Sequence, residues 1–174
     1  MIPACQAPDR FSTGRLTAEK LHESHLSDLV ALHLDPEVSR YLGGVRSPEV
    51  TKEYLKTNMA HWDRHGFGLW ALRTRAGEFA GRAGIRHLAF DDFADIEIAY
   101  TFKRSCWGQG FASEIAGALT QIGLLQLKLP SLVGLIHVRN AASRRVVEKL
   151  GYILERTTRY HGEDVVIYRS PPTA

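Results

Sequence analysis

The fold of this chain is decided by IEIAYTF, residues 96–102, and by WGQGFA, residues 107–112, which follows it closely. Residues 96–102 alternate between two faces as a β-strand does, and apolar residues recur at helical spacing in the run SEIAGALTQIGLLQL that begins at Ser113. Gly108 and Gly110 therefore lie where the chain turns from strand into helix. Because glycine lets backbone N–H groups approach an anion and a helix start adds unpaired donors, the turn predicts a site for a phosphate-bearing cofactor.

The glycine spacing fits only some phosphate-binding motifs. The turn lacks the Gly-Lys-Ser/Thr ending of a P-loop, and it lies in the second half of the chain, unlike the early three-glycine turn of a Rossmann fold. Two glycines with one residue between them are equally typical of a tight turn between packed elements. The glycine spacing alone does not distinguish a phosphate site from a packed turn, so the neighbouring elements must be considered.

The rest of the sequence predicts an α/β fold with a mixed sheet of about seven strands and helices on both faces. Alternating residues predict strands, and apolar residues three or four positions apart predict helices. The predicted strands cover residues 15–21, 68–75, 79–90, 96–102, 131–138, 152–160 and 164–170. The predicted helices cover residues 25–34, 48–62, 111–129 and 140–150. The order is therefore β-α-α-β-β-β-α-β-α-β-β.

Length and composition limit the class of protein. The 174 residues predict a single domain spanning residues 1–174, with residues 1–13 as a loose lead-in. The net charge of +3 does not suggest the concentrated basic stripe of a nucleic-acid-binding protein. No apolar run approaches the ~20 residues of a membrane span, and the N-terminus does not resemble a signal peptide. We therefore expect a cytoplasmic protein without a nucleic-acid or membrane partner.

A second motif, NAASRRVVEKLGY, begins at Asn140. Asn140 and Ser143 are three residues apart, so they share one side of the first turn of the predicted helix. Asparagine is a common N-cap, and capping alone would explain both residues. The preceding strand, residues 131–138, is expected to lie beside residues 96–102. The helix that Asn140 begins is therefore expected to open on the same cleft as the glycine turn.

Together the two motifs resemble the GNAT superfamily of acetyl-CoA-dependent N-acetyltransferases, and within it the RimJ/RimL-like group. The resemblance extends from about Arg15 to Tyr168, and the order of elements agrees throughout. It implies the GNAT fold, with a mostly antiparallel sheet, and acetyl-CoA as the acetyl donor. A homodimer is a further expectation at the level of the family.

The resemblance also implies which residues bind coenzyme A. In the family, backbone amides of the glycine turn hold the pyrophosphate, the preceding strand pairs with the pantetheine arm, and an asparagine contacts that arm near the thiol. Trp107 departs from the family pattern, which has Gln or Arg at this position. The implied cofactor-binding residues are Tyr100, Thr101, Phe102, Trp107, Gly108, Gln109, Gly110, Phe111, Ala112, Ser113, Asn140 and Ser143.

Glu97 and Ser143 are the candidate catalytic residues. A protonated amine must lose a proton before it attacks a thioester, and a carboxylate can accept that proton directly or through water. Glu97 matches the glutamate often found on this family strand, although a solvated strand face would also explain it; Asp91 and Asp92 are weaker candidates. Many members carry a tyrosine seven residues after the asparagine to protonate the thiolate. Val147 occupies that position here, so Ser143 is the candidate donor, or only part of the helix cap.

The sequence says least about the acceptor and about metals. The acceptor is expected to be a protein N-terminus or a small-molecule amine, with Tyr41, Trp62 and Trp70 as candidate pocket residues or, alternatively, core residues. The eight histidines suggest no zinc-ligand spacing, so no metal is expected. The alternative to an enzyme is a non-catalytic acyl-CoA-binding or regulatory module, which would keep the glycine turn and Asn140 but have no need of Glu97.

Overall fold

The computed structural model describes residues 5–172, so residues 1–4 of the expected lead-in and residues 173–174 lie outside the described part. The described chain contains one eight-stranded sheet in the order β1-β2-β3-β4-β5-β6-β8-β7. Its strands are β1 (Arg10–Ser12), β2 (Leu16–Lys20), β3 (Leu69–Thr74), β4 (Phe79–Phe90), β5 (Phe93–Phe102), β6 (Val133–His137), β7 (Ile153–Tyr160) and β8 (Glu163–Arg169). The α-helices are α1 (Leu26–Leu34), α2 (Pro48–His65), α3 (Phe111–Gln121) and α4 (Ala141–Lys149). The short helical segments are η1 (Glu23–His25), η2 (Val38–Tyr41), η3 (Arg104–Cys106) and the π-helical η4 (Ile122–Gln126).

The predicted α/β fold and its order of elements are confirmed, with one more strand than the seven or so expected. The additional strand is β1, which occupies residues 10–12 of the predicted lead-in and pairs antiparallel with β2. A strand of three residues has too little alternation to stand out in a sequence, because its stability comes from its partner strand. The predicted helix of residues 111–129 is also interrupted, since α3 passes into η4 at Ile122.

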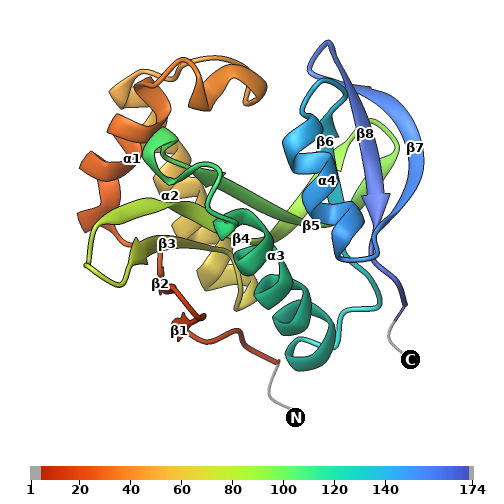
Figure 1. Ribbon diagram of the computed structural model, residues 1–174, viewed down its shortest axis with the longest axis horizontal. Helices are drawn as coiled ribbons and strands as arrows, with labels where there is room; N and C mark the ends of the chain where they lie inside the picture. The colour runs from red at the N-terminus through yellow and green to blue at the C-terminus, as the bar shows by residue number, and fades with distance from the viewer. Residues whose placement is uncertain (1–4, 173–174) are drawn as a thin grey trace.

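Two helical layers cover the two faces of the sheet (Figure 1). On one face, α1 and α2 pack over a core that includes Leu29, Leu55 and Leu69. On the other face, α3 and α4 pack over a larger core that includes Ile115 and Val147. The apolar stripes of the amphipathic helices are thereby buried on the sheet. None of the described helices is both long and apolar enough to cross a membrane.

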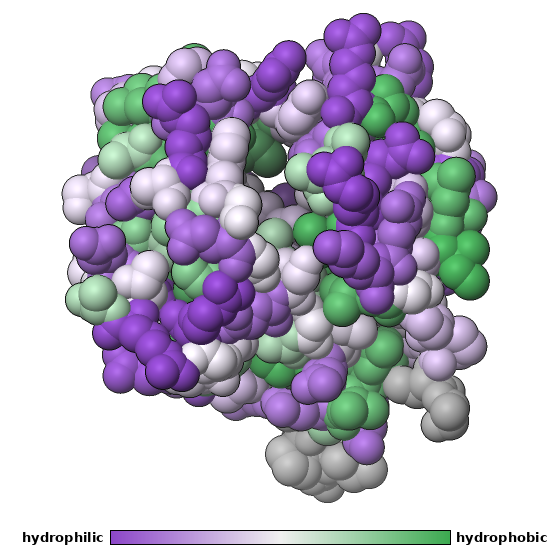
Figure 2. Space-filling view, in the orientation of Figure 1, coloured by the Kyte–Doolittle hydropathy of each residue, from purple (hydrophilic) through white to green (hydrophobic). Residues whose placement is uncertain are grey.

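The parallel strands β5 and β6 are joined only briefly at the centre of the sheet. Their one recorded residue pair is Glu97 with Val133. Beyond it, residues 98–102 pair only with β4, and residues 134–137 pair only with β8. The two strands therefore diverge and divide the sheet into two parts. The space-filling view shows a hollow on this side of the molecule, between the part that carries α1 and η2 and the part that carries β6 and α4 (Figure 2).

Candidate functional site

The glycine turn lies at the end of β5 and leads directly into α3. Gly108 and Gly110 have φ angles of 71° and 78°, in the left-handed region that disfavours residues with a Cβ atom. A Cβ at Gly108 would meet nothing within 4 Å, so glycine is required there by backbone conformation and not by crowding. Gly110 is the N-cap of α3 and supplies no side-chain cap.

The start of α3 offers free backbone donors. Its first helical hydrogen bond runs from the Glu114 amide to the Gly110 carbonyl, at 3.1 Å. The amides of Phe111, Ala112 and Ser113 precede it and have no carbonyl one helical turn earlier to bond. The positive end of the helix dipole lies at the same place. This geometry suits an anion such as a pyrophosphate.

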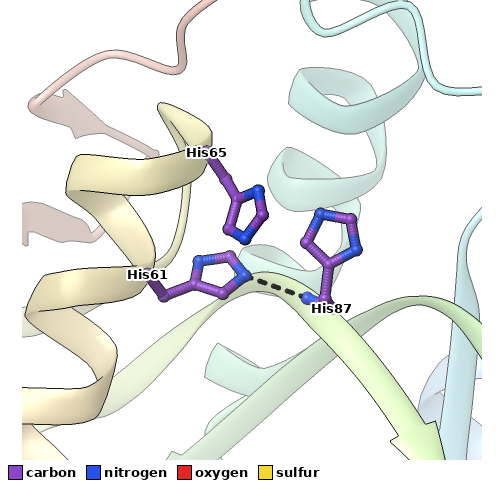
Figure 3. Close-up of side chains that lie close together, drawn as sticks. All are labelled: His61, His65 and His87. Atoms are coloured by element: carbon purple, nitrogen blue, oxygen red, sulfur yellow. Dashed lines mark hydrogen bonds between the residues drawn. The ribbon is translucent and has the colours of Figure 1, made fainter.

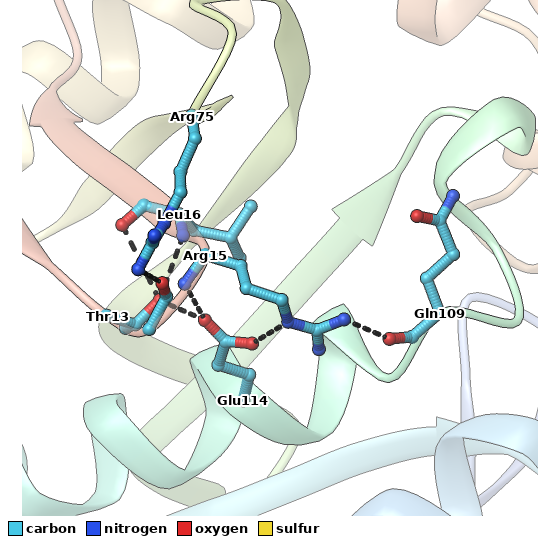
Figure 4. A network of polar contacts seen from close by, with 7 residues as sticks. Thr13, Arg15, Leu16, Arg75, Gln109 and Glu114 are labelled. Carbon is cyan, nitrogen blue, oxygen red and sulfur yellow. Dashed lines mark hydrogen bonds and ion pairs between the residues drawn. The ribbon is translucent and has the colours of Figure 1, made fainter.

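Arg15 and Glu114 form a network that fixes the turn from outside (Figure 4). The Arg15 guanidinium donates to the Glu114 carboxylate and to the Gln109 carbonyl, both at 2.7 Å. Thr13 also donates to Glu114. Burial works to raise the pKa of Glu114, but the hydrogen bonds from Thr13 and Arg15 outweigh it and hold that pKa below its ordinary value. The start of β2 therefore holds the turn in place, a role that our sequence analysis did not predict.

Trp107 and Gln109 tie the turn to the preceding chain. The indole Nε1 of Trp107 donates to the Phe102 carbonyl at 2.9 Å, and the Gln109 side chain donates to the Ser105 carbonyl at 2.8 Å. Half of Trp107 remains exposed to solvent. Its indole therefore anchors the turn at a position where the family pattern has Gln or Arg, and the backbone amides stay available.

Asn140 and Ser143 lie at the start of α4, as predicted, and connect it to β5. The Asn140 side chain caps the helix by accepting from the Ser143 amide at 3.1 Å. The Ser143 hydroxyl donates to the Tyr100 hydroxyl at 3.3 Å, and Tyr100 in turn donates to the Ser143 carbonyl at 3.2 Å. Burial raises the pKa of Tyr100 to about 12. Val147, at the position of the family tyrosine, is fully buried and packs in the core.

Glu97 is buried at the point where β5 and β6 separate. It is 4% exposed, and its carboxylate accepts from Arg86 Nε at 2.7 Å across the β4–β5 pair. Burial works to lower the pKa of Arg86, but the charge of Glu97 outweighs it, and that pKa is raised. Residues alternate along β5, so Glu97 faces the α1 and α2 layer, whereas Tyr100 faces the layer of α3 and α4. Glu97 and Ser143 therefore approach the opening from opposite faces of the sheet.

The face that carries Glu97 also carries a group of basic and aromatic residues. Arg82 lies four residues before Arg86 on β4 and is 2% exposed. The guanidinium carbons of Arg82 and Arg46 lie 5.4 and 5.0 Å from the centre of the Tyr54 ring. Arg82 Nε and the Tyr54 hydroxyl are both buried without a hydrogen-bond partner. No local sequence signal singled out these residues, because Arg82 is placed by the strand register and Tyr54 by the packing of α2.

The weaker sequence candidates lie elsewhere. Asp91 and Asp92 are exposed at the tip of the β4–β5 hairpin. Trp62 and Trp70 are core residues, because they are 3% and 0% exposed and pack edge to face against each other. Tyr41 instead reaches across to the loop between β6 and α4, where its hydroxyl donates to the Arg139 carbonyl at 3.3 Å.

Three histidines meet near the C-terminal end of α2, which corrects the expectation that no histidines have metal-ligand spacing (Figure 3). His61 and His65 lie one helical turn apart on α2, and His87 comes from β4; one ring nitrogen of each lies within 4.8 Å of the others. Burial, together with the neighbouring imidazoles, lowers the pKa of His61 to about 4. The four-residue spacing of His61 and His65 was a usable signal, whereas His87 could be added only from the fold.

Comparison with known proteins agrees with this geometry. The family model described as an acetyltransferase (GNAT) domain matches residues 15–153. The uncharacterized protein YkkB of Bacillus subtilis is 33% identical over 164 residues, which cover 93% of this chain and 95% of YkkB. An acetyltransferase structure from Agrobacterium tumefaciens superposes with a TM-score of 0.82 at 26% identity, covering 95% of each chain. RimL, a ribosomal L7/L12 alpha-N-protein acetyltransferase in complex with coenzyme A, superposes with a TM-score of 0.75 at 24% identity, covering 94% of this chain and 96% of RimL.

Proposed function

This chain belongs to the GNAT acetyltransferase family, and we propose that it transfers the acetyl group of acetyl-CoA directly to a primary amine. The acceptor is a protein N-terminus or a small-molecule amine. RimL is named for a protein acceptor, but a likeness at 24% identity supports the fold and not the acceptor. The proposal rests on one feature, the opening between β5 and β6, which has free helix-start amides at one end and a buried carboxylate at the other.

The residues of the turn fit the phosphate-bearing part of acetyl-CoA. The amides of Phe111, Ala112 and Ser113 lack helical partners, and the open space beside Gly108 lets a ligand approach the backbone. These amides would hold the pyrophosphate. The β5 backbone from Tyr100 to Phe102, which pairs with β4 but not with β6, would hold the pantetheine arm. Asn140 would contact the arm near the thiol, since its amide nitrogen is not used in capping α4.

Glu97 would accept the proton that the amine must lose before it can attack the thioester carbonyl, either directly or through water. The amine nitrogen then bonds to the carbonyl carbon, and backbone donors near Tyr100 stabilise the oxyanion of the tetrahedral intermediate. When the carbon–sulfur bond breaks, the nitrogen loses its second proton to water, and the Ser143 hydroxyl would give its proton to the sulfur and regain one from solvent. Because the Ser143 hydroxyl donates to Tyr100 in this structure, it would have to turn from Tyr100 towards the sulfur for this step.

The ion pair with Arg86 gives the buried Glu97 carboxylate a partner of opposite charge, since Arg86 Nε lies 2.7 Å from Glu97 Oε1. The pair also holds the carboxylate at the junction of β5 and β6. The alternative function, a non-catalytic acyl-CoA-binding module, gives no reason for a buried carboxylate at the junction of β5 and β6. This placement of Glu97 favours the enzyme.

A thiol-release assay tests the proposal. The full chain is mixed with acetyl-CoA and a panel of small amines and N-terminal peptides, and free coenzyme A is measured with a thiol reagent. We expect release that depends on at least one amine and yields the acetylated amine by mass spectrometry. Binding of acetyl-CoA without release for any amine in the panel would support the non-catalytic module instead.

A further inference from the structure

The face of β4 that carries Arg86 holds more positive charge than the described protein balances. Arg46, Arg82 and Arg86 contribute three guanidinium groups there, and Glu97 contributes the one carboxylate that pairs with any of them. Arg86 pairs with Glu97, and Arg46 bonds the Leu42 carbonyl. Among residues 5–172, Arg82 forms no ion pair.

Two polar atoms in this group are buried without a partner, Arg82 Nε and the Tyr54 hydroxyl. Such atoms are uncommon in folded proteins, because each loses its hydrogen bonds to water and gains none in return. The cation–π contacts of Arg46 and Arg82 with the Tyr54 ring are attractive, but they satisfy neither the Nε–H nor the hydroxyl. Packing alone therefore leaves these two donors unexplained.

The local electrostatics agree with an excess of positive charge. His33, on α1, lies against Arg46, with 3.4 Å between the Arg46 guanidinium and His33 Nε2. Its pKa is lowered to about 3, first by burial and then by the charges of Arg82 and Arg46. Burial also lowers the pKa of Arg82. A bound anion would favour the charged forms of His33 and Arg82 and so raise both pKa values.

We propose that Arg82 and Tyr54, with Arg46, form a subsite for an anionic group of the acceptor, so that the acceptor is an amine that also carries a carboxylate or a phosphate. This inference rests on the proposed acetyl transfer. A guanidinium fork and a neighbouring hydroxyl are the donors that such oxygens prefer. The anion would complete the buried hydrogen bonds of Arg82 and Tyr54 and neutralise the charge of Arg82.

The strand register sets the length of the acceptor. Arg82 pairs with Thr101 and Arg86 pairs with Glu97, so both arginines and Glu97 lie on the same face. Four residues separate the two arginines, which corresponds to roughly 13 Å between their Cα atoms along a strand. The amine of the acceptor would lie at Glu97 and its anionic group at Arg82. Several bonds therefore separate the two groups, and the distance between them is no more than roughly 13 Å.

Three series of acceptors test this subsite. Each contains amines of increasing chain length, ending in a carboxylate, in a phosphate or in an uncharged carboxamide, and kcat/KM is measured with the full chain and acetyl-CoA. We expect the wild type to favour one anionic series over the carboxamides by at least tenfold, at one preferred length. Arg82→Met and Tyr54→Phe should reduce this preference at least fivefold and leave kcat/KM for the carboxamides within twofold. Arg159→Met, in the β7–β8 hairpin, is the matched control and should keep the preference.

The outcomes separate this inference from the proposed function. Turnover without any preference for an anionic series would overturn the subsite and leave acetyl transfer in place. Equal losses on all three series in Arg82→Met and Tyr54→Phe would also overturn it, since they would show a structural role only. If the wild type acetylates no amine at all, the proposed function itself fails.

The histidine cluster carries a second, independent inference. His61 Nδ1 lies 2.8 Å from the Phe67 carbonyl, to which it donates, so its Nε2 is left as an acceptor. A carbonyl in this position is the usual way in which a metal-binding histidine is oriented. Nε2 now accepts from the His87 amide at 3.1 Å, in an exposed position where water can replace it. Within residues 5–172, the rings of His65 and His87 form no hydrogen bond that would fix them in this way.

We infer that His61, His65 and His87 bind one divalent transition-metal ion of the kind that imidazole prefers, such as Zn²⁺. Three imidazole nitrogens within 4.8 Å need only side-chain rotations to reach the spacing of a tetrahedral site, and water would supply the remaining ligand. The ion would join the end of α2 to β4, at a distance along β4 from the anionic subsite. It is therefore assigned no part in acetyl transfer.

Calorimetric titration of the full chain with ZnCl₂ tests this site. We expect saturable binding of one ion per chain, accompanied by a rise in Tm. His65→Ala should weaken binding at least tenfold, whereas His161→Asn, which removes a histidine from the β7–β8 turn, should not change it. Absence of saturable binding, or equal affinity in wild type and His65→Ala, would overturn the inference.

Discussion

The two sides of the β5–β6 opening are built on different principles. On the proposed cofactor side, the glycine turn offers backbone amides, and side chains such as Arg15, Glu114 and Trp107 hold the turn through hydrogen bonds. On the proposed acceptor side, the buried side chains of Arg82 and Tyr54 lie on the same face of the sheet as Glu97, and Arg82 Nε and the Tyr54 hydroxyl lack partners. Backbone recognition suits a donor that stays the same across a family, whereas side-chain recognition lets each member select its own acceptor.

The largest expected effect comes from Glu97→Gln, which tests the side chain where the two sides meet. Loss of a general base should lower kcat by about 10²- to 10³-fold. The affinity for acetyl-CoA, measured by calorimetry, should change less than twofold, because Glu97 lies outside the turn. Asp92→Asn, at the exposed tip of the same hairpin, is the control and should keep full activity. A kcat within threefold of wild type for Glu97→Gln would remove Glu97 from the mechanism.

The second prediction concerns the acid stability of the acceptor side. The pKa of His33 is about 3 in the folded chain against an ordinary value of 6.5, so below pH 6.5 the unfolded chain binds a proton that the folded chain does not. The contribution of neutral His33 to the free energy of unfolding should therefore be complete above pH 6.5 and decrease as the pH falls towards 3. A fully buried histidine contributes a slope of about 1.4 kcal/mol per pH unit, or about 2 kcal/mol between pH 6.5 and 5.

Urea unfolding at pH 7.5 and pH 5 measures this slope. Between these pH values, the free energy of unfolding of His33→Gln should decline by about 2 kcal/mol less than that of the wild type. His161→Asn, which removes an exposed histidine, should decline as the wild type does. A decline in His33→Gln equal to that of the wild type would show that His33 is not held neutral by its surroundings.

A smaller effect is expected from Gly110→Ala on the cofactor side. Forcing alanine into the left-handed conformation costs about 1–2 kcal/mol, so acetyl-CoA should bind roughly 5- to 30-fold more weakly if the strain distorts the start of α3. Gly162→Ala introduces the same strain in the β7–β8 turn, where φ is 82°, and serves as the control. It should lower Tm without changing the affinity. Equal affinities for the two variants would mean that the turn does not hold the cofactor.

The smallest effect is expected from Arg15→Met, which removes a support of the turn and leaves the amides intact. Because Arg15 is half exposed, its ion pair with Glu114 contributes only about 0.5–1 kcal/mol, so the affinity for acetyl-CoA should fall about two- to fivefold. Arg10→Met removes a more exposed pair with Glu19 on a neighbouring strand and should leave the affinity unchanged. A loss for Arg15→Met as large as that for Gly110→Ala would indicate that Arg15 contacts the cofactor itself.

The two sides also differ in how far the sequence predicted them. The strand, turn and helix of residues 96–121 were predictable, because alternation, glycine position and helical spacing are local signals. The role of Arg15 was not, since its partner Glu114 lies 99 residues away. The acceptor face was hidden for the same reason: Arg82 and Tyr54 meet only through packing of α2 on the sheet. Strand β1 was missed because three residues carry too short a pattern.

A crystal structure of the chain with coenzyme A would show whether the glycine turn holds the cofactor. We expect pyrophosphate oxygens within about 3 Å of backbone nitrogens between Gly108 and Ser113. We also expect the sulfur to lie in the opening between β5 and β6, with Glu97 on one side and Ser143 on the other. Coenzyme A bound elsewhere, or a pyrophosphate held by side chains while these amides remain free, would show that the turn is not the cofactor site.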